Sequence, residues 1–290
     1  MSKIPSVALL MVTHNRAELL EQVLNQVNTF YWDYSEFLVI DNASTDETTN
    51  IISKYEKGLN IQFFSLDSNI GHGAGLAKGL DFLNQNYSNL DYVVFLEDDS
   101  IPQADYLSFL LNKIQGTGFT LISSSGSLVS LGKRTKLEPN ESEILAADFA
   151  LFDGAIARFH DLINIGFPVR DWFMMFDDFE YCYRIRKAGF NIGVVANPHL
   201  EILHEGWGGG VSHSHLWRSY YQSRNFVHFV RLHFTMFTLW DFVILQGKRL
   251  VGGFFTKNGL ATTKMRLMGI RAGIVGKKGR SLDLKTLKER

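Results

Sequence analysis

Strand-like and helix-like segments alternate four times in the first hundred residues. Short apolar runs begin at Val7, Glu36, Ile61 and Tyr92, and polar turns and amphipathic segments with a helical period separate them. This alternation predicts right-handed crossovers and a mainly parallel sheet flanked by helices, which is an α/β fold.

The element boundaries follow from the same patterns. We expect strands at 7–13, 36–40, 61–65, 92–96, 120–128 and 146–152, helices at about 17–27, 45–57, 72–84, 102–113 and 177–188, and a loop at 132–143. Ser44 or Thr45 is expected to cap the second helix.

Polar side chains follow each of the first four strands. They occur at 13–16, 41–42, 69–71 and 97–99, directly after or at the ends of the apolar runs. Because ligands bind at the carboxyl edge of an open α/β sheet, we expect the active site at this edge.

Three consecutive carboxylates, Glu97, Asp98 and Asp99, end the fourth strand. Close like charges repel unless a cation neutralises them. Strand geometry would place Glu97 and Asp99 on one face and Asp98 on the other. Oxygen ligands favour Mg²⁺ or Mn²⁺. The alternative is a solvated acidic turn that only ends the strand.

A glycine-rich segment covers residues 69–79. Its spacing matches neither the dinucleotide fingerprint nor a P-loop. Two interpretations are open: the glycines let backbone N–H groups approach a phosphate or ribose, or they allow close packing of a helix on the sheet.

A second acidic centre lies at Asp177 and Asp178, after a run of aromatic residues and methionines. Either acid could cap the helix that follows, or serve as a general base beside an apolar wall. Further on, His204 precedes the glycine-rich stretch 206–210, which is typical of an element that closes over a substrate.

Composition limits the cellular setting. The single Cys182 excludes an internal disulfide framework and suits a reducing compartment, and no signal peptide is recognised at the start. Residues 1–212 carry 14 Lys and Arg against 27 Asp and Glu, whereas residues 213–290 carry 15 against 3. A basic tail of this kind could meet nucleic acid or an anionic membrane.

The basic tail predicts two or three helices between residues 215 and 276. Its most apolar stretch, 226–246, is interrupted by Arg231 and Asp241, which argues against a transmembrane helix. The tail could lie in an anionic membrane interface or pack on the catalytic core with a solvated basic face. Nucleic acid is disfavoured, because the predicted site is acidic and no recognition motif is present.

Taken in order, residues 6–230 resemble glycosyltransferase family 2, the inverting nucleotide-sugar transferases of GT-A fold. The resemblance lies in Thr13-x-Asn15-Arg16, 40–46, 69–71, Glu97-Asp98-Asp99 as a D-x-D motif, Asp177-Asp178-x-Glu180 and His204. It implies a catalytic domain at 1–212, with a nucleotide-sugar half at about 1–100 and an acceptor half at about 101–212, and a basic helical region at 213–290.

The resemblance also implies roles for individual residues. Asp178 matches the catalytic base. Mn²⁺ or Mg²⁺ would be held by Glu97, Asp99 and His204. The nucleotide sugar would contact Thr13, Asn15, Arg16, Asp41, Asn69, Gly71 and Asp98. The acceptor region would include Trp172, Asp177, Glu180 and Trp207.

A narrower resemblance is to bacterial galactofuranosyl- and rhamnosyltransferases of cell-surface polysaccharide synthesis, carried by 166–168, 172–173, 177–181 and 220–225. It implies UDP-galactofuranose as donor, with dTDP-rhamnose as the alternative, and a saccharide or lipid-linked saccharide acceptor. It implies a cytoplasmic protein, peripheral on the inner face of the plasma membrane. Two other classes remain open: a non-catalytic sugar-nucleotide or polysaccharide-binding protein, and a hydrolase with two carboxylates.

Overall fold

The strand–helix alternation is present in the computed structural model, which describes all residues except 1–3, 31, 88, 203–215 and 254–258. The first half comprises β1 (Val7–Thr13), α1 (Ala17–Val27), β2 (Glu36–Asp41), α2 (Thr48–Tyr55), β3 (Ile61–Ser65), α3 (His72–Asn86) and β4 (Tyr92–Phe95). The second half comprises β5 (Ser100–Pro102), α4 (Tyr106–Ile114), β6 (Phe119–Ser123), β7 (Gly126–Ser130), β8 (Lys133–Lys136), β9 (Leu145–Ala147), β10 (Phe149–Ala150), β11 (Ile156–Arg158), α5 (Phe159–Ile165), α6 (Asp177–Lys187), β12 (Asn191–Val194) and β13 (Leu200–Ile202).

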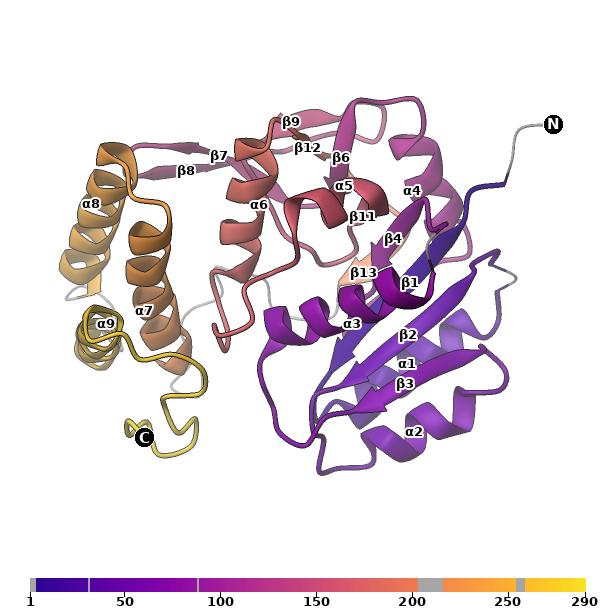
Figure 1. Ribbon diagram of the computed structural model, residues 1–290, viewed down its shortest axis with the longest axis horizontal. Coiled ribbons are helices and arrows are strands. Elements are labelled where there is room, and N and C mark those ends of the chain that lie inside the picture. The colour runs from indigo at the N-terminus through magenta and orange to yellow at the C-terminus, as the bar shows by residue number, and fades with distance from the viewer. Residues whose placement is uncertain (1–3, 31, 88, 203–215, 254–258) are drawn as a thin grey trace.

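Among the described residues, one eight-stranded sheet forms the centre of the molecule, in the order β3-β2-β1-β4-β11-β6-β12-β9 (Figure 1). The four N-terminal strands are parallel to one another, and β12 is parallel to β6. The pairs β4–β11, β11–β6 and β12–β9 are antiparallel. The sheet is therefore mixed, with parallel pairing dominant, and the expected α/β class is confirmed.

Helices cover both faces of this sheet because successive side chains of a buried strand point to opposite faces. In β1, Leu9 and Met11 pack in a core with α1, α2 and α4. The alternate residues Leu10 and Val12 pack in a second core with α3, α5 and α6. The result is a three-layer arrangement with α1 and α2 on one side and α3 on the other (Figure 1).

Three local expectations are corrected by the structure. The expected strand 120–128 is two strands, β6 and β7, and the expected loop 132–143 contains β8, which pairs antiparallel with β7. The second helix begins at Thr48, whose backbone N–H donates to Asp46 Oδ1 at 3.0 Å. Ser44 and Thr45 do not cap it, because both bind Asn15 in the preceding loop.

The tail contains α7 (Leu216–Leu232), α8 (Met236–Gly253) and α9 (Gly259–Ile274), as the sequence predicts. These helices lie together at one end of the molecule, beside α6 and away from β3 (Figure 1). Phe226 and Phe229 of α7 form an apolar cluster with Trp172, and Phe176 and Phe179 pack against it. Within the described part of the chain, no helix is long and apolar enough to cross a bilayer.

Candidate active site

The polar clusters expected at the sheet edge do meet there. Thr13 is in register with Asp41 across β1 and β2, and Asp41 is in register with Ser65 across β2 and β3. The register places the ends of these strands side by side. The backbone continues the alignment, since the Asn42 N–H donates to the Thr13 carbonyl oxygen at 2.8 Å.

The three acids after β4 converge on this edge from a turn. Thr13 Oγ1 donates to Asp98 Oδ2 at 2.7 Å, and Arg16 Nη1 lies 3.0 Å from Asp99 Oδ2. One oxygen from each of Glu97, Asp98 and Asp99 lies within 4.8 Å of the others. The expected strand-like alternation of these side chains is wrong, because β4 ends at Phe95 and residues 98–99 form a turn.

The acidic cluster has the chemistry of a hard-cation site. The pKa of Asp98 is raised to about 7, chiefly by burial and also by neighbouring Asp99 and Glu97, while the hydrogen bond from Thr13 acts in the opposite direction. Burial and Glu97 likewise raise the pKa of Asp153 to about 7, although Ser100 Oγ donates to it at 3.0 Å. A divalent ion bound by these oxygen atoms would relieve the repulsion between the neighbouring carboxylates. Each of the three acids also has a partner inside the protein: Thr13 for Asp98, Arg16 for Asp99 and His72 for Glu97.

The other residues that the resemblance assigns to the nucleotide sugar form hydrogen bonds within the loops at this edge of the sheet. Asp41 is almost fully buried and accepts hydrogen bonds from the Ser44 N–H and from Ser65 Oγ. Asn69 Oδ1 accepts from the Gly71 N–H at 3.0 Å. Asn15, with a left-handed φ of 52°, accepts from the Thr45 N–H at 2.7 Å. The structure thus places these residues beside one another, with their polar groups partly used inside the protein.

The glycines of the 69–79 segment permit close packing. A β-carbon at Gly75 would lie 2.8 Å from Val12, and one at Gly79 would lie 2.3 Å from Leu10, so both positions let α3 approach β1. A β-carbon at Gly71, where φ is +95°, would lie 1.5 Å from the Phe173 carbonyl oxygen. A β-carbon at Gly73 would lie 2.8 Å from Asp177. The helix-packing interpretation therefore accounts for Gly75 and Gly79, whereas Gly71 and Gly73 let the start of α3 lie against Phe173 and Asp177.

The second acidic centre occupies the first turn of α6. Phe176 is the N-cap residue, in a left-handed conformation, and no side chain caps the helix, so Asp177 and Asp178 are not caps. Burial and the neighbouring Asp177 raise the pKa of Asp178 well above its ordinary value. A carboxyl group whose pKa is raised in this way is a candidate for proton transfer.

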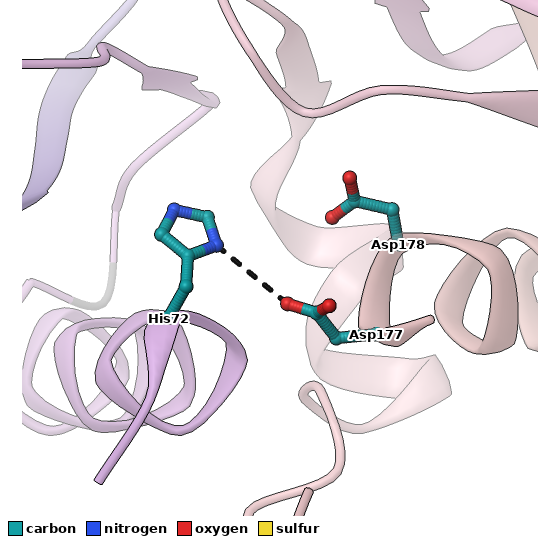
Figure 2. A group of neighbouring side chains, drawn as sticks. All are labelled: His72, Asp177 and Asp178. Atoms are coloured by element: carbon teal, nitrogen blue, oxygen red, sulfur yellow. Dashed lines mark ion pairs between the residues drawn. The ribbon is translucent and has the colours of Figure 1, made fainter. Parts of the chain in front are cut away.

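His72 joins the two acidic centres and was not predicted as a site residue. Its Nε2 lies 3.4 Å from Glu97 Oε1, and its Nδ1 lies 3.6 Å from Asp177 Oδ2. Figure 2 shows His72 at the start of α3 facing Asp177 and Asp178 at the start of α6. Although burial lowers the pKa of His72, Glu97 and Asp177 raise it well above its ordinary value. The signal available in the sequence was its position, directly after the third polar cluster.

A second unpredicted contributor is Asn225 of α7, which is fully buried. Its Nδ2 donates to the carbonyl oxygens of Met174 and Met175, each at 2.8 Å. Met175 and Phe176 both have positive φ, of 69° and 74°. The tail therefore holds the strained turn that leads directly into Asp177 and Asp178.

The residues expected in the acceptor region differ in exposure and in their contacts. Asp177 lies in the site, whereas Trp172 and Glu180 are nearly or fully buried. Glu180 Oε1 accepts from Arg184 Nε at 2.7 Å and lies 2.9 Å from His233 Nε2, so its carboxylate is engaged inside the protein. The predicted metal ligand His204 and the predicted acceptor residue Trp207 lie outside the described residues.

Residues 8–182 match the family described as Glycosyl transferase family 2. Among curated proteins, a poly-beta-1,6-N-acetyl-D-glucosamine synthase of Staphylococcus aureus (strain COL) is 22% identical over 206 residues, which cover 66% of this chain and 48% of the relative. The chain thus spans about half the length of this relative.

Solved structures show the same fold at low sequence identity. S. aureus TarS 1–349 is 15% identical with a TM-score of 0.60, and the match covers 93% of this chain and 81% of TarS. Mannosyltransferase PcManGT from Pyrobaculum calidifontis, solved with GDP-Man and Mn²⁺, is 15% identical with a TM-score of 0.60. The match covers 95% of this chain and 89% of PcManGT. GalNAc-T7, solved with UDP, GalNAc and Mn²⁺, is 13% identical with a TM-score of 0.65. The match covers 96% of this chain and 57% of GalNAc-T7. The expected GT-A fold is confirmed.

Proposed function

Because this chain belongs to glycosyl transferase family 2, we propose that it is an inverting, metal-dependent transferase that moves a sugar from a nucleotide-diphosphate donor to a saccharide hydroxyl. The observation that carries the proposal is the pairing of two acidic centres at one sheet edge. Glu97 to Asp99 come from the end of β4, Asp177 and Asp178 come from α6, and His72 lies between them.

The chemistry assigned to the chain follows from this arrangement. Asp178 takes the proton of the acceptor hydroxyl as that oxygen attacks the anomeric carbon, and the bond to the nucleotide diphosphate breaks on the opposite side. Arg16, next to Asp99, offers a positive charge on the donor side. A divalent ion held by Glu97 and Asp99 would supply Lewis-acid neutralisation of the departing diphosphate.

For the donor we propose UDP-galactofuranose, with dTDP-rhamnose as the alternative, on the resemblance of 177–181 and 220–225 to galactofuranosyl- and rhamnosyltransferases. The general class of donor has support from relatives: a further TarS structure contains UDP-GlcNAc, and the PcManGT structure contains GDP-Man and Mn²⁺. Either Mn²⁺ or Mg²⁺ suits the oxygen ligands.

For the acceptor we propose a saccharide, lipid-linked, in cell-surface polysaccharide synthesis. The name of the curated relative, a polysaccharide synthase, supports this class of product. We further propose a catalytic domain over 1–212, with donor and acceptor halves dividing at about residue 100, and roles for Trp172 and Trp207 in the acceptor region. We place the protein in the cytoplasm, at the inner face of the plasma membrane.

Calorimetric titration tests the donor site. UDP and dTDP are each titrated with Mn²⁺ and with EDTA, on the native protein and on Asp99→Ala. We expect metal-dependent binding of one nucleotide, weakened at least tenfold in Asp99→Ala. UDP binding favours galactofuranose and dTDP binding favours rhamnose, while absence of binding to both would contradict the proposed donor class.

Asp178→Asn tests the base and separates the alternatives. Turnover is expected to fall by a factor of about 10² to 10⁴ while nucleotide binding is retained, because only proton removal is lost. Unchanged turnover would remove Asp178 from this role. A hydrolase would instead release sugar without acceptor, and a binding protein would bind nucleotide without turnover in the native chain.

A further inference from the structure

Helix α8 is packed with its polar side inward. Thr238, Asp241 and Gln246 are buried, and Asp241 is only 2% exposed. Its carboxylate accepts from the Gly132 N–H at 2.8 Å and forms an ion pair with Arg134, which ties α8 to the β7–β8 hairpin. These three polar residues are therefore turned toward the interior.

The opposite side of α8 is apolar and exposed. Met236, Trp240, Val243 and Val251 recur at helical spacing along one stripe, and Trp240 is 51% exposed. Exposed apolar residues also precede this stripe in the turn from α7, at Leu232 and Phe234. Exposed apolar side chains that recur along one side of a helix are typical of an interaction site, because burying them from water is favourable.

Helix α9 presents a matching stripe in which apolar and basic residues alternate. Leu260, Lys264, Leu267, Arg271 and Ile274 follow one another at spacings of three and four residues, and all five are exposed. Its buried side consists largely of small residues, and Gly269 and Gly273 let the helix approach α7 closely. We use the name C-terminal apolar–basic face for the exposed residues of these two stripes and of the connection before α8, namely Leu232, Phe234, Met236, Phe237, Trp240, Val243, Val251, Leu260, Lys264, Leu267, Arg271 and Ile274.

We propose that the C-terminal apolar–basic face binds the surface of an anionic lipid bilayer, with the apolar side chains in the headgroup boundary and Lys264 and Arg271 on lipid charges. The tail from residue 213 carries 15 basic against 3 acidic residues, so its charge is complementary to anionic lipid. Both charged residues of the face, Lys264 and Arg271, are basic, so a symmetric contact with a second copy would bring like charges together.

This inference deepens the proposed function and rests on it for the membrane setting, because it names the face that would make the contact; vesicle binding tests that face separately from the transfer reaction. The face lies on the helices at the end of the molecule where α7 supports the turn before Asp177 and Asp178 (Figure 1). Docking by α8 and α9 would keep the acceptor side of the proposed site near lipid-linked substrates.

Vesicle sedimentation tests the face directly. The full-length protein is mixed with vesicles of phosphatidylcholine alone, or with one-third phosphatidylglycerol, at 50 and 500 mM NaCl. We expect binding to the anionic vesicles at low salt that weakens at high salt. Met236→Glu/Trp240→Glu and Lys264→Glu/Arg271→Glu are each expected to reduce the partition coefficient at least tenfold.

Matched variants on the far side of the molecule are the controls. Phe64→Glu on β3 and Lys57→Glu/Lys78→Glu replace exposed apolar and basic residues outside the face, and both should bind vesicles as the native chain does. Circular dichroism and nucleotide titration check that each variant is folded. Absence of native binding, or equal loss in the control variants, would overturn the proposal. A dimer by light scattering that Met236→Glu/Trp240→Glu abolishes, without vesicle binding, would assign the face to a second copy instead.

Discussion

At the scale of single residues, the buried amide of Asn225 has an energetic consequence for the site. Met175 and Phe176 are consecutive non-glycine residues with positive φ, a conformation that costs about 1–3 kcal/mol per residue. The two hydrogen bonds from Asn225 Nδ2 and the stacking of Phe176 on Phe226, with ring centroids 4.7 Å apart, offset that cost. Asn225 is therefore a positioning residue for Asp177 and Asp178.

Asn225→Ala is expected to lower the free energy of unfolding by about 1–3 kcal/mol, because two buried carbonyl oxygens lose their donor. Urea unfolding measures this change. Turnover should fall while nucleotide binding changes little, since the donor-side acids come from β4 and not from α6. The control is Asn112→Ala, an exposed position on α4, which should leave both quantities unchanged. A variant Asn225→Ala with native stability and native turnover would contradict the positioning role.

At the scale of elements, the site depends on how closely the start of α3 approaches the start of α6. Gly71 and Gly73 have no β-carbon where one would collide with Phe173 and Asp177, respectively. This contact places His72 between the two acidic centres, within 3.4 Å of Glu97 and 3.6 Å of Asp177. The spacing between donor and acceptor sides is thus set by a helix–helix contact.

Gly71→Ala tests this contact. The added β-carbon would meet a carbonyl oxygen at 1.5 Å in a residue with φ of +95°, so α3 and α6 must move apart. We expect a loss of at least 2 kcal/mol in unfolding free energy together with a large loss of turnover. Gly247→Ala in α8, where a β-carbon meets no atom within 4 Å, is the control and should stabilise the protein by about 0.5–1 kcal/mol. Native-like unfolding and turnover of Gly71→Ala would show that the close contact is dispensable.

At the scale of the whole molecule, the concentration of acids at one edge couples stability to pH. Asp98 and Asp153 have pKa values of about 7 in the folded chain and near the ordinary value of 3.8 when unfolded. Between about pH 4 and pH 7 the folded chain therefore binds more protons than the unfolded chain. By linkage, the free energy of unfolding falls as pH rises through this window.

A divalent ion should reverse that trend, because it replaces protons as the source of positive charge. In EDTA we expect a lower melting temperature at pH 8 than at pH 5.5, and a stabilisation by Mn²⁺ that is larger at pH 8. Differential scanning calorimetry at both pH values measures this difference. Asp99→Ala should lose most of the stabilisation by Mn²⁺. An equal effect of Mn²⁺ at both pH values would argue against the edge as the cation site.

Local pattern in the sequence was sufficient for the alternation of strands and helices, for the polar edge and for the two acidic centres, because these depend on periodicity and on the parallel connection of neighbouring segments. The sequence did not determine that the acids at 97–99 would converge, because the orientation of the side chains depends on where the strand ends. Nor could it separate the two interpretations of the glycines, since their neighbours, such as Phe173 and Asp177, lie about a hundred residues away in the chain.

The tertiary structure decided which polar residues face inward. Asp241 interrupts an apolar stretch in the sequence, and in the structure it is buried against Arg134, which leaves the apolar side of α8 exposed. Asn225 acts on Met174 and Met175, about fifty residues earlier in the chain. The physical reason is common to both: burial of a polar group is favourable only with a partner, and here the partner comes from a distant segment.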